Sequence, residues 1–144
     1  ASVFSKWIQA MINGDELFIN GNGEDRRDFC FINNVIQANL ISATIQCEGL
    51  NGSHSNDANN HIYNIAVGNR TTLTELYFIL RDNLSSRFPY LENAQPIYRD
   101  FRKGDVLHSQ ADISKAISKL GYQPSFSAYE GLIEAMDWYV NNRK

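Results

Sequence analysis

Apolar side chains recur at helical spacing in five segments of this 144-residue chain, and each segment predicts an α-helix. The first helix is predicted over residues 3–12 and ends at Asn13 and Gly14, a pair that favours a left-handed stop. The second is predicted to begin with Asn33 or Asn34 as its N-cap. The other three are predicted around residues 72–84, 113–120 and 127–140.

Two of these helices carry the spacing of a capping box, in which a Ser or Thr and a Glu three residues later each bond the other's backbone N–H. The pairs are Thr72 with Glu75 and Ser127 with Glu130. Periodicity also predicts which side chains face inward. They are Val35, Ala38, Ile41, Ser42 and Ile45 in the second helix, and Leu132, Ile133, Met136, Tyr139 and Val140 in the last.

Short apolar runs between the helices predict β-strands. Ile62–Val67 is the clearest, and Leu17–Ile19, Phe29–Ile32 and Pro96–Tyr98 are shorter. We therefore expect an α/β fold with one small mixed sheet and about five helices, in a single domain that spans residues 1–144. Residues 47–60 are almost entirely Gly, Asn, Ser, His and Asp, so this segment is predicted to be a mobile surface loop.

Composition narrows the possible functions. A formal net charge of −3 argues against general nucleic-acid binding, which needs a basic face to displace phosphate counterions. No apolar run approaches the roughly 20 residues that span a bilayer, and no basic and apolar leader opens the chain, so we expect a soluble cytoplasmic protein. Cys30 and Cys47 are the only cysteines, and two reduced thiols are the favoured interpretation, with a single disulfide left open.

Two arginine-bearing loops are the most informative chemical feature. Gly21 and Gly23 predict a hairpin turn that is followed by Arg26 and Arg27. About seventy residues later, the run from Tyr98 to Val106 contains Arg102. Two arginine forks that close on one anion match the oxygens of a phosphate or carboxylate, which indicates a diphosphate ligand.

A simpler interpretation is that the arginines pair with acidic neighbours at the surface. Arg27 is followed by Asp28, and Arg102 is followed three residues later by Asp105. Exposed pairs of this kind contribute only about 0–1 kcal/mol. For an isolated Arg–Asp pair this interpretation is the better one, but the presence of two such loops favours a ligand.

Other chemistries lack a signature in this sequence. Gly21-x-Gly23 has no third glycine and is not a dinucleotide fingerprint. His54, His61 and His108 have no partners at metal-ligand spacing, and there is no Gly-x-Ser-x-Gly motif. No tyrosine is followed by a lysine four residues later. We therefore predict no metal site and no catalytic residue in this chain.

Several separate motifs, in order, resemble those of a known family. The chain is similar to the C-terminal substrate-binding portion of extended short-chain dehydrogenases/reductases, within the NAD-dependent epimerase/dehydratase family. The greatest resemblance is to bacterial UDP-N-acetylglucosamine 4-epimerases of polysaccharide synthesis. The motifs are Ser2–Trp7, Ile19–Glu24, Arg27–Ile32, Tyr63–Gly68, Thr71–Leu76, Tyr98–Val106, Ala111–Lys115, Leu120–Pro124 and the helix Gly131–Tyr139.

The resemblance implies a role for each matching position. Arg27 and Arg102 would hold the diphosphate of a UDP-sugar, and Asp105 would bind the uridine ribose. Phe18 would lie along the uracil. Ser2 and Val3 would line the pocket near the sugar.

The family reaction also implies what this chain lacks. The family transfers a hydride from sugar C4 to NAD and returns it to the other face, with a Tyr-x-x-x-Lys pair and a three-glycine NAD loop. Neither motif occurs here, so we expect a substrate-binding fragment that alone neither binds NAD nor epimerises. NAD would be the cofactor of the full-length enzyme, expected to be a homodimer. The partner of this portion would be a missing N-terminal Rossmann domain.

Two departures weaken any assignment of the sugar. Ser5 stands where the family usually has Pro, and Leu107 stands where relatives often carry a basic side chain. The alternatives are a portion of another sugar-nucleotide dehydratase or uronate epimerase, a stand-alone nucleotide-binding module, and a structural or assembly domain with surface arginines.

Overall fold

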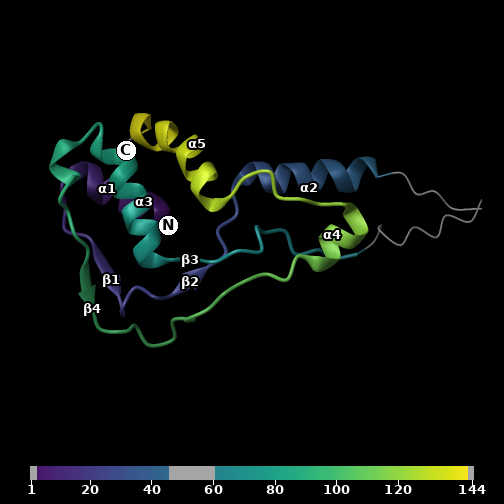
Figure 1. Cartoon of the computed structure of the whole chain (residues 1–144), viewed down its shortest axis with the longest axis horizontal. Helices are drawn as coiled ribbons and strands as arrows, with labels where there is room; N and C mark the ends of the chain where they lie inside the picture. Colours follow the sequence, from purple (N-terminus) through teal and green to yellow (C-terminus); the bar gives the residue numbers. More distant parts are fainter. Residues whose placement is uncertain (1–2, 46–60, 143–144) are drawn as a thin grey trace, which may run out of the picture.

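The computed structural model describes residues 3–45 and 61–142, so Ser2 and the loop predicted over residues 47–60 lie outside the described part. Within that part the chain forms five α-helices and four short strands, which confirms the predicted α/β class (Figure 1). The helices are α1 Val3–Asn13, α2 Ile32–Thr44, α3 Leu73–Ser85, α4 Ser114–Leu120 and α5 Ala128–Asn141. The strands are β1 Phe18–Asn20, β2 Arg26–Arg27, β3 Thr71–Thr72 and β4 Ile97–Arg99, and a 3-10 turn spans Pro89–Leu91.

The strands form two separate pairs rather than one mixed sheet. β1 pairs in parallel with β4, and β2 pairs antiparallel with β3. The predicted hairpin at Gly21 and Gly23 is therefore wrong, because the strands before and after the turn pair with different partners. Residues distant in sequence replace the local pairing that the glycine turn suggested.

Two predicted strands are also wrong. Phe29–Phe31 is irregular and Ile32 already begins α2. Ile62–Val67, the clearest strand in the sequence, has no strand assignment, because within the described residues no other strand lies beside it to complete a ladder. Backbone groups of this segment are bonded instead by side chains, among them the Tyr122 hydroxyl, which donates to the Ala66 carbonyl at 2.9 Å.

The main core lies where α1, α3 and α5 pack together (Figure 1). α1 buries Trp7, Ile8, Met11 and Ile12, and α3 contributes the most deeply buried leucines. Ile133 of α5 was predicted to face inward but is 41% exposed. The central side chains are Trp7, Ile8, Met11, Ile19, Leu76, Leu80, Leu84, Leu132 and Met136.

A second, smaller core joins α2 and α4 at the other end of the molecule. It contains Ala38, Ile113, Ala116, Leu120 and the fully buried Tyr122. Of the inward face predicted for α2, Ala38 is buried, but Ser42 is exposed.

Asn34 does not cap α2, which corrects the prediction for that helix start. The N-cap is Phe31, and no side chain bonds there. Asn34 is fully buried inside the first turn, where its amide donates to the Phe126 carbonyl at 2.8 Å. Its side-chain oxygen accepts from the backbone N–H groups of Ser125 and Phe126 at 2.9 and 3.0 Å. Asn34 thus fixes the segment that leads into α5.

Both predicted capping boxes are confirmed. At the start of α3, Thr72 accepts from the Glu75 N–H at 3.0 Å, and the Glu75 carboxylate accepts from the Thr72 N–H at 2.8 Å. Ser127 and Glu130 make the equivalent pair of bonds at the start of α5. Each box satisfies two backbone N–H groups that the helix itself leaves unpaired.

Candidate functional site

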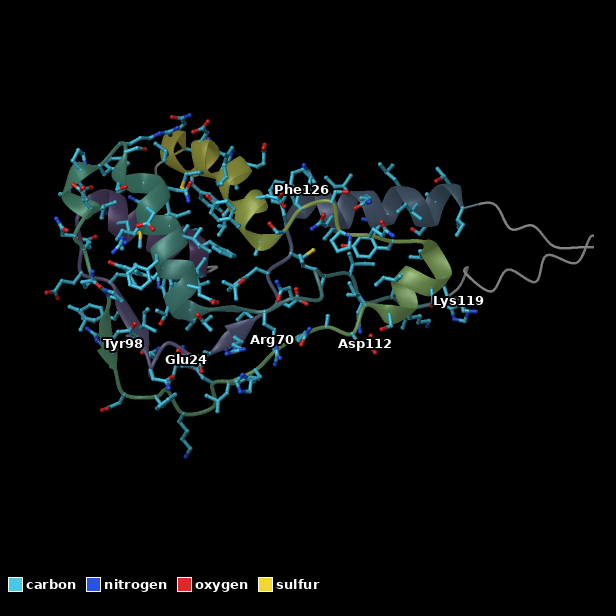
Figure 2. All side chains as sticks on the ribbon, viewed as in Figure 1. Glu24, Arg70, Tyr98, Asp112, Lys119 and Phe126 are labelled. Atoms are coloured by element: carbon cyan, nitrogen blue, oxygen red, sulfur yellow. The ribbon has the colours of Figure 1, made fainter. Side chains whose placement is uncertain are left out.

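The two arginine-bearing loops leave the same edge of one strand pair. Because β1 and β4 are parallel, with Asn20 opposite Arg99, both loops begin at the carboxyl ends of these strands. The N–H of Gly21 donates to the Arg99 carbonyl at 2.9 Å, so the first residue of one loop is bonded to the end of the other strand. The side chains of Tyr98 and Glu24 lie at this end of the molecule, far from Lys119 (Figure 2).

The loops meet again beyond the strands. The Arg26 N–H donates to the Leu107 carbonyl at 2.8 Å, and the Ser109 N–H donates to the Arg26 carbonyl at 3.1 Å. These bonds form an isolated parallel bridge between Arg26 and His108. The segment that carries Arg27 therefore runs beside the end of the loop that carries Arg102 and Asp105. This pairing is the specific contact that brings the two sequence motifs into one region.

Close packing against α3 explains Gly23. Its φ is +78°, and an added Cβ would overlap the Thr74 hydroxyl and approach the Tyr98 ring. The Gly23 carbonyl accepts from the Thr74 N–H at 3.1 Å, and the Asp25 carbonyl accepts from the Leu73 N–H at 3.0 Å. The loop thus supplies partners for the first N–H groups of α3, and only glycine fits at this approach.

Asp28 bonds to backbone rather than to Arg27, so the simple surface-pair interpretation of Arg27 is wrong. The Asp28 carboxylate accepts from the N–H groups of Val67 and Gly68, each at 3.1 Å, and from Ala111 at 3.4 Å. Arg27 is half-buried and donates to the carbonyl of Arg26 at 2.9 Å. Its charge is therefore not neutralised by the adjacent acid.

Arg102 and Asp105 are exposed at either end of a tight turn. The Asp105 N–H donates to the Arg102 carbonyl at 3.2 Å, and Gly104 has a φ of +91°. Within the part of the chain that the structure describes, ion pairs join Arg81 to Asp82 and Arg87 to Asp137. Neither Arg27 nor Arg102 takes part in an ion pair among those residues, so both cations are available to an anion.

Phe18 and Val3 have different surroundings. Phe18 is half-buried on β1, and the guanidinium carbon of Arg99 lies 3.2 Å from its ring centroid. Val3 is half-buried at the start of α1 and packs against the main core. The neighbouring Phe4 lies 4.6 Å from Phe29 between ring centroids, so the start of α1 reaches the segment just after β2. Ser2 lies outside the described residues.

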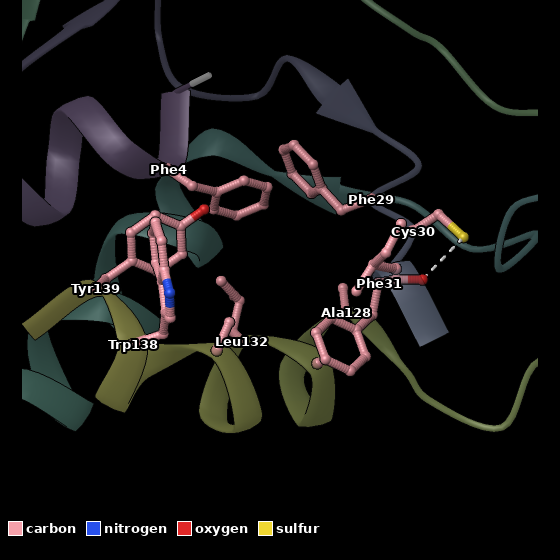
Figure 3. Close-up of a pocket in the computed structure, with 11 residues that line it drawn as sticks. Phe4, Phe29, Cys30, Phe31, Ala128, Leu132, Trp138 and Tyr139 are labelled. Carbon is pink, nitrogen blue, oxygen red and sulfur yellow. Dashed lines mark hydrogen bonds between the residues drawn. The ribbon is translucent and has the colours of Figure 1, made fainter. Parts of the chain in front are cut away.

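A cavity of about 390 Å³ lies between α5 and the segment Phe29–Ile32 (Figure 3). Its walls are mainly apolar, and none of the predicted ligand residues that the structure describes lines it. The lining residues are Phe4, Phe29, Cys30, Phe31, Ile32, Ala128, Gly131, Leu132, Ala135, Trp138 and Tyr139. A second cavity, of about 380 Å³, is bordered by Gly68 and residues 110–114, and again by none of the predicted site residues within the described part of the chain.

Two titratable groups in the packed parts of the chain have raised pKa values: Tyr122 in the second core, and Cys30, which lines the first cavity. Burial raises the pKa of Tyr122 to about 12, and the proximity of Cys30 and Asp28 adds to the shift. Burial likewise raises the pKa of the Cys30 thiol, although a hydrogen bond with Asn34 partly offsets it. A raised thiol pKa disfavours the reactive thiolate, so Cys30 has the character of an inert packing residue.

Among residues 3–45 and 61–142, no group of three or more His, Cys, Asp or Glu side chains is arranged to hold a metal ion. The same residues contain no helix long and apolar enough to cross a membrane.

Sequence reasoning missed Asp28 and Asn34 as organising residues. Their bonds reach residues 39 to 92 positions away, and no local pattern carries that information. It also missed Arg99, although Arg99 lies inside the second arginine motif. Side chains alternate between the two faces of a strand, so Arg99 lies on the same face of β4 as Ile97, the residue that is paired with Phe18.

Comparison with known proteins shows which protein family this chain resembles. Residues 1–66 match the model of the NAD dependent epimerase/dehydratase family. A protein of Methanocaldococcus jannaschii assigned as a UDP-glucose 4-epimerase is 31% identical over the whole of this chain and 41% of its own length. These matches confirm the resemblance found in the sequence: the chain is similar, over its whole length, to members of the NAD dependent epimerase/dehydratase family.

Two further relatives are similar over nearly the whole of this chain. A UDP-N-acetylglucosamine 4-epimerase of Methanobrevibacter ruminantium, solved with UDP-N-acetylmuramic acid, is 30% identical with a TM-score of 0.77. The match covers 99% of this chain and 40% of that one. A dTDP-glucose 4,6-dehydratase of Haemophilus influenzae is 29% identical over 94% of this chain and 38% of its own length. The chain thus spans about two fifths of the length of the relatives that it matches.

Proposed function

We propose that this chain is the nucleotide-holding portion of an NAD-dependent UDP-sugar 4-epimerase, with UDP-N-acetylglucosamine or UDP-glucose as substrate in surface polysaccharide synthesis. Arg27 and Arg102 hold the diphosphate, Asp105 binds the ribose, and Phe18 carries the uracil. Ser2 and Val3 lie near the sugar. The observation that supports this proposal most directly is the backbone pairing of Arg26 with Leu107 and Ser109, which joins the two arginine segments.

The electrostatics of the region support an anionic ligand. Arg27 is half-buried, and the adjacent Asp28 is occupied by three backbone N–H groups. A guanidinium without an acidic partner forms strong, charge-assisted bonds with phosphate oxygens. Such bonds contribute about 1.5–3 kcal/mol each when they are shielded from water, so two arginines are sufficient for measurable binding of a diphosphate.

Asp105 is placed to act on a neutral part of the ligand. It lies three residues after Arg102 in the same turn, and it is exposed. A carboxylate beside a diphosphate would repel it, whereas ribose hydroxyls are hydrogen-bond donors that a carboxylate accepts. The proposal therefore assigns Asp105 to the ribose and the arginines to the phosphates.

The chemistry of epimerisation belongs to other residues of the proposed longer protein. This sequence has no Tyr-x-x-x-Lys pair and no three-glycine loop, so we propose that the chain alone is inactive and binds no NAD. We also propose that the longer enzyme is a cytoplasmic homodimer that uses NAD. In that enzyme, the role of this chain is to bind and orient the nucleotide so that the sugar is held in one place.

The test is a calorimetric titration of this chain with UDP, with AMP and pyrophosphate as comparison ligands. UDP is expected to bind with a Kd in the millimolar range, about −4 kcal/mol, and AMP to bind more weakly. Arg27→Ala and Arg102→Ala are each expected to weaken UDP binding at least tenfold. Arg87→Ala is the matched control, because Arg87 pairs with Asp137 on the surface. Equal UDP affinity in all three variants would contradict the proposal.

A second candidate is a sugar-nucleotide dehydratase or uronate epimerase, and the similarity to a dTDP-glucose 4,6-dehydratase favours it. The diphosphate arginines would serve either enzyme. Comparison of UDP with dTDP separates the two at the level of binding, since a dehydratase of that kind would prefer dTDP. Product analysis of the longer enzyme with UDP-N-acetylglucosamine then separates epimerisation from dehydration.

A further inference from the structure

Arg99 covers one face of the Phe18 ring. Phe18 is paired with Ile97 in the parallel register of β1 and β4, and Arg99 follows two residues later, on the same face of the strand pair. The guanidinium carbon lies 3.2 Å from the ring centroid, which is a cation–π contact.

The Arg99 side chain is exposed, while its backbone is bonded to the first loop. Its carbonyl accepts from the Gly21 N–H at 2.9 Å, and all three residues of β4 are exposed. Within residues 3–45 and 61–142 the guanidinium takes part in no ion pair. The contact with Phe18 is therefore the interaction that holds this cation in place.

Arg99 leads directly into the turn that carries Arg102 and Asp105, so the Phe18 ring lies beside the strand from which the second arginine loop begins. A base stacked on the covered face of the ring would occupy the layer about 3.5 Å above the ring. The Arg99 guanidinium already lies in that layer. The base and the guanidinium cannot both be there.

We infer that Arg99 covers the base-binding face of Phe18 in the free chain, and that the nucleobase of a nucleoside diphosphate displaces it. This inference rests on the proposed function. An exposed cation–π contact is weaker than the stacking of a base on an aromatic ring, so a bound nucleotide places its base on the ring and displaces the guanidinium. A ligand without a base leaves Arg99 on the ring. Arg99 thus sets how much of the binding comes from the base and how much from the diphosphate.

The test compares UDP with pyrophosphate in wild-type chain and in Arg99→Ala, by calorimetric titration. Loss of the Arg99 charge weakens the binding of both ligands. The ratio of the two dissociation constants cancels this effect and reports the contribution of the base alone. The preference for UDP over pyrophosphate is expected to rise about two- to fivefold in Arg99→Ala, the factor that an exposed cation–π contact corresponds to. Arg87→Ala serves as the control and is expected to leave the ratio unchanged.

A spectroscopic readout checks the displacement itself. In the free chain the Phe18 ring shifts the NMR signals of the Arg99 side-chain protons upfield, and Phe18→Leu is expected to remove this shift. UDP is expected to return the Arg99 signals to ordinary positions, whereas pyrophosphate leaves them shifted. Arg99 signals that stay upfield at saturating UDP would overturn the inference.

The outcomes distinguish this inference from the proposed function. If UDP binds through Arg27 and Arg102 but its preference over pyrophosphate is unchanged or lower in Arg99→Ala, the inference fails and the proposed function stands. If Arg99→Ala binds UDP and wild-type chain does not, the inference is supported in its strongest form. If both forms are folded and neither binds UDP, Phe18 carries no base, and both proposals fail.

Discussion

The carboxylate of Asp28 accepts a hydrogen bond from the N–H of Gly68 at 3.1 Å, across forty residues of sequence. The same carboxylate also accepts from the N–H groups of Val67 and Ala111, so it extends the connection between these three segments beyond the end of the β2–β3 pair. Arg27 is its direct neighbour in the sequence, but in our proposal Arg27 binds the ligand and does not stabilise the fold. The Arg–Asp dipeptide thus divides into one structural residue and one ligand residue.

Replacement of Asp28 by Ala is expected to destabilise the chain by about 1–3 kcal/mol, because it leaves three partly buried N–H groups without this acceptor. Urea unfolding followed by circular dichroism measures this change. Asp100→Ala is the matched control, since Asp100 is exposed and is expected to change the free energy of unfolding by less than about 0.5 kcal/mol. Similar stabilities of the two variants would show that the Asp28 bonds are not important.

Asn34 and Asn33 offer a second matched pair on α2. Asn34 is fully buried and makes three hydrogen bonds to the backbone of Ser125 and Phe126, whereas Asn33 is exposed. Asn34→Ala is expected to cost about 2–4 kcal/mol of unfolding free energy, and Asn33→Ala less than about 0.5 kcal/mol. If the sequence-based prediction were right and Asn33 capped the helix, Asn33→Ala would instead cost about 1 kcal/mol.

The two asparagines also show what the sequence can and cannot predict. Helical periodicity and capping boxes are local, so all five helices and both boxes were predicted correctly. The partner of a buried amide ninety residues away is not local, so Asn34 was predicted, like Asn33, as a possible cap. The same limit explains Ile62–Val67, whose composition is that of a strand. Strand formation also needs a neighbour, and none lies beside this segment in the described residues.

The candidate site shows the same division between local and distant information. The two arginine motifs were visible in the sequence, and their meeting through Arg26, Leu107 and Ser109 agrees with the expectation that the loops approach each other. The pairing of β1 with β4 brings this about, but the sequence pointed to a hairpin instead. The cover that Arg99 places on Phe18 depends on that register, and it was therefore not predicted.

Tyr122 makes the stability of the chain sensitive to alkaline pH. Burial raises its pKa from 10.0 to about 12 in the folded chain. The folded state therefore holds the phenol proton more tightly, and this contribution is complete below pH 10 and lost as the pH rises through about 12. Urea unfolding across this range is expected to show a steeper loss of stability for wild-type chain than for Tyr122→Phe.

The exposed Tyr129 provides the control for this titration. Tyr129→Phe keeps Tyr122 and is expected to follow the wild-type dependence of stability on pH. A phenolate absorbance titration of the folded chain gives an independent check, because the signal lost in Tyr122→Phe identifies the tyrosine that ionises last. If Tyr122→Phe and wild-type chain lost stability in parallel, the hydroxyl bond to Ala66 would not hold the proton.

A comparison of alanine variants at Gly23 and Gly104 separates the cost of backbone strain from the cost of steric overlap. Both have positive φ, so alanine is strained at either position by about 1–2 kcal/mol. At Gly104 an added Cβ meets nothing within 4 Å, whereas at Gly23 it would overlap Thr74 and press on Tyr98. Gly23→Ala is therefore expected to cost at least about 2 kcal/mol more than Gly104→Ala in urea unfolding.

The two variants also differ in what they do to the candidate site. Gly23→Ala has to move the loop away from α3, which shifts the backbone that leads to Arg27 and is expected to weaken UDP binding even where the chain stays folded. Gly104→Ala alters only the turn between Arg102 and Asp105, so its effect on binding is expected to exceed its effect on stability. Equal unfolding free energies for the two variants would mean that the loop adapts without loss, and that its packing on α3 does not fix the position of Arg27.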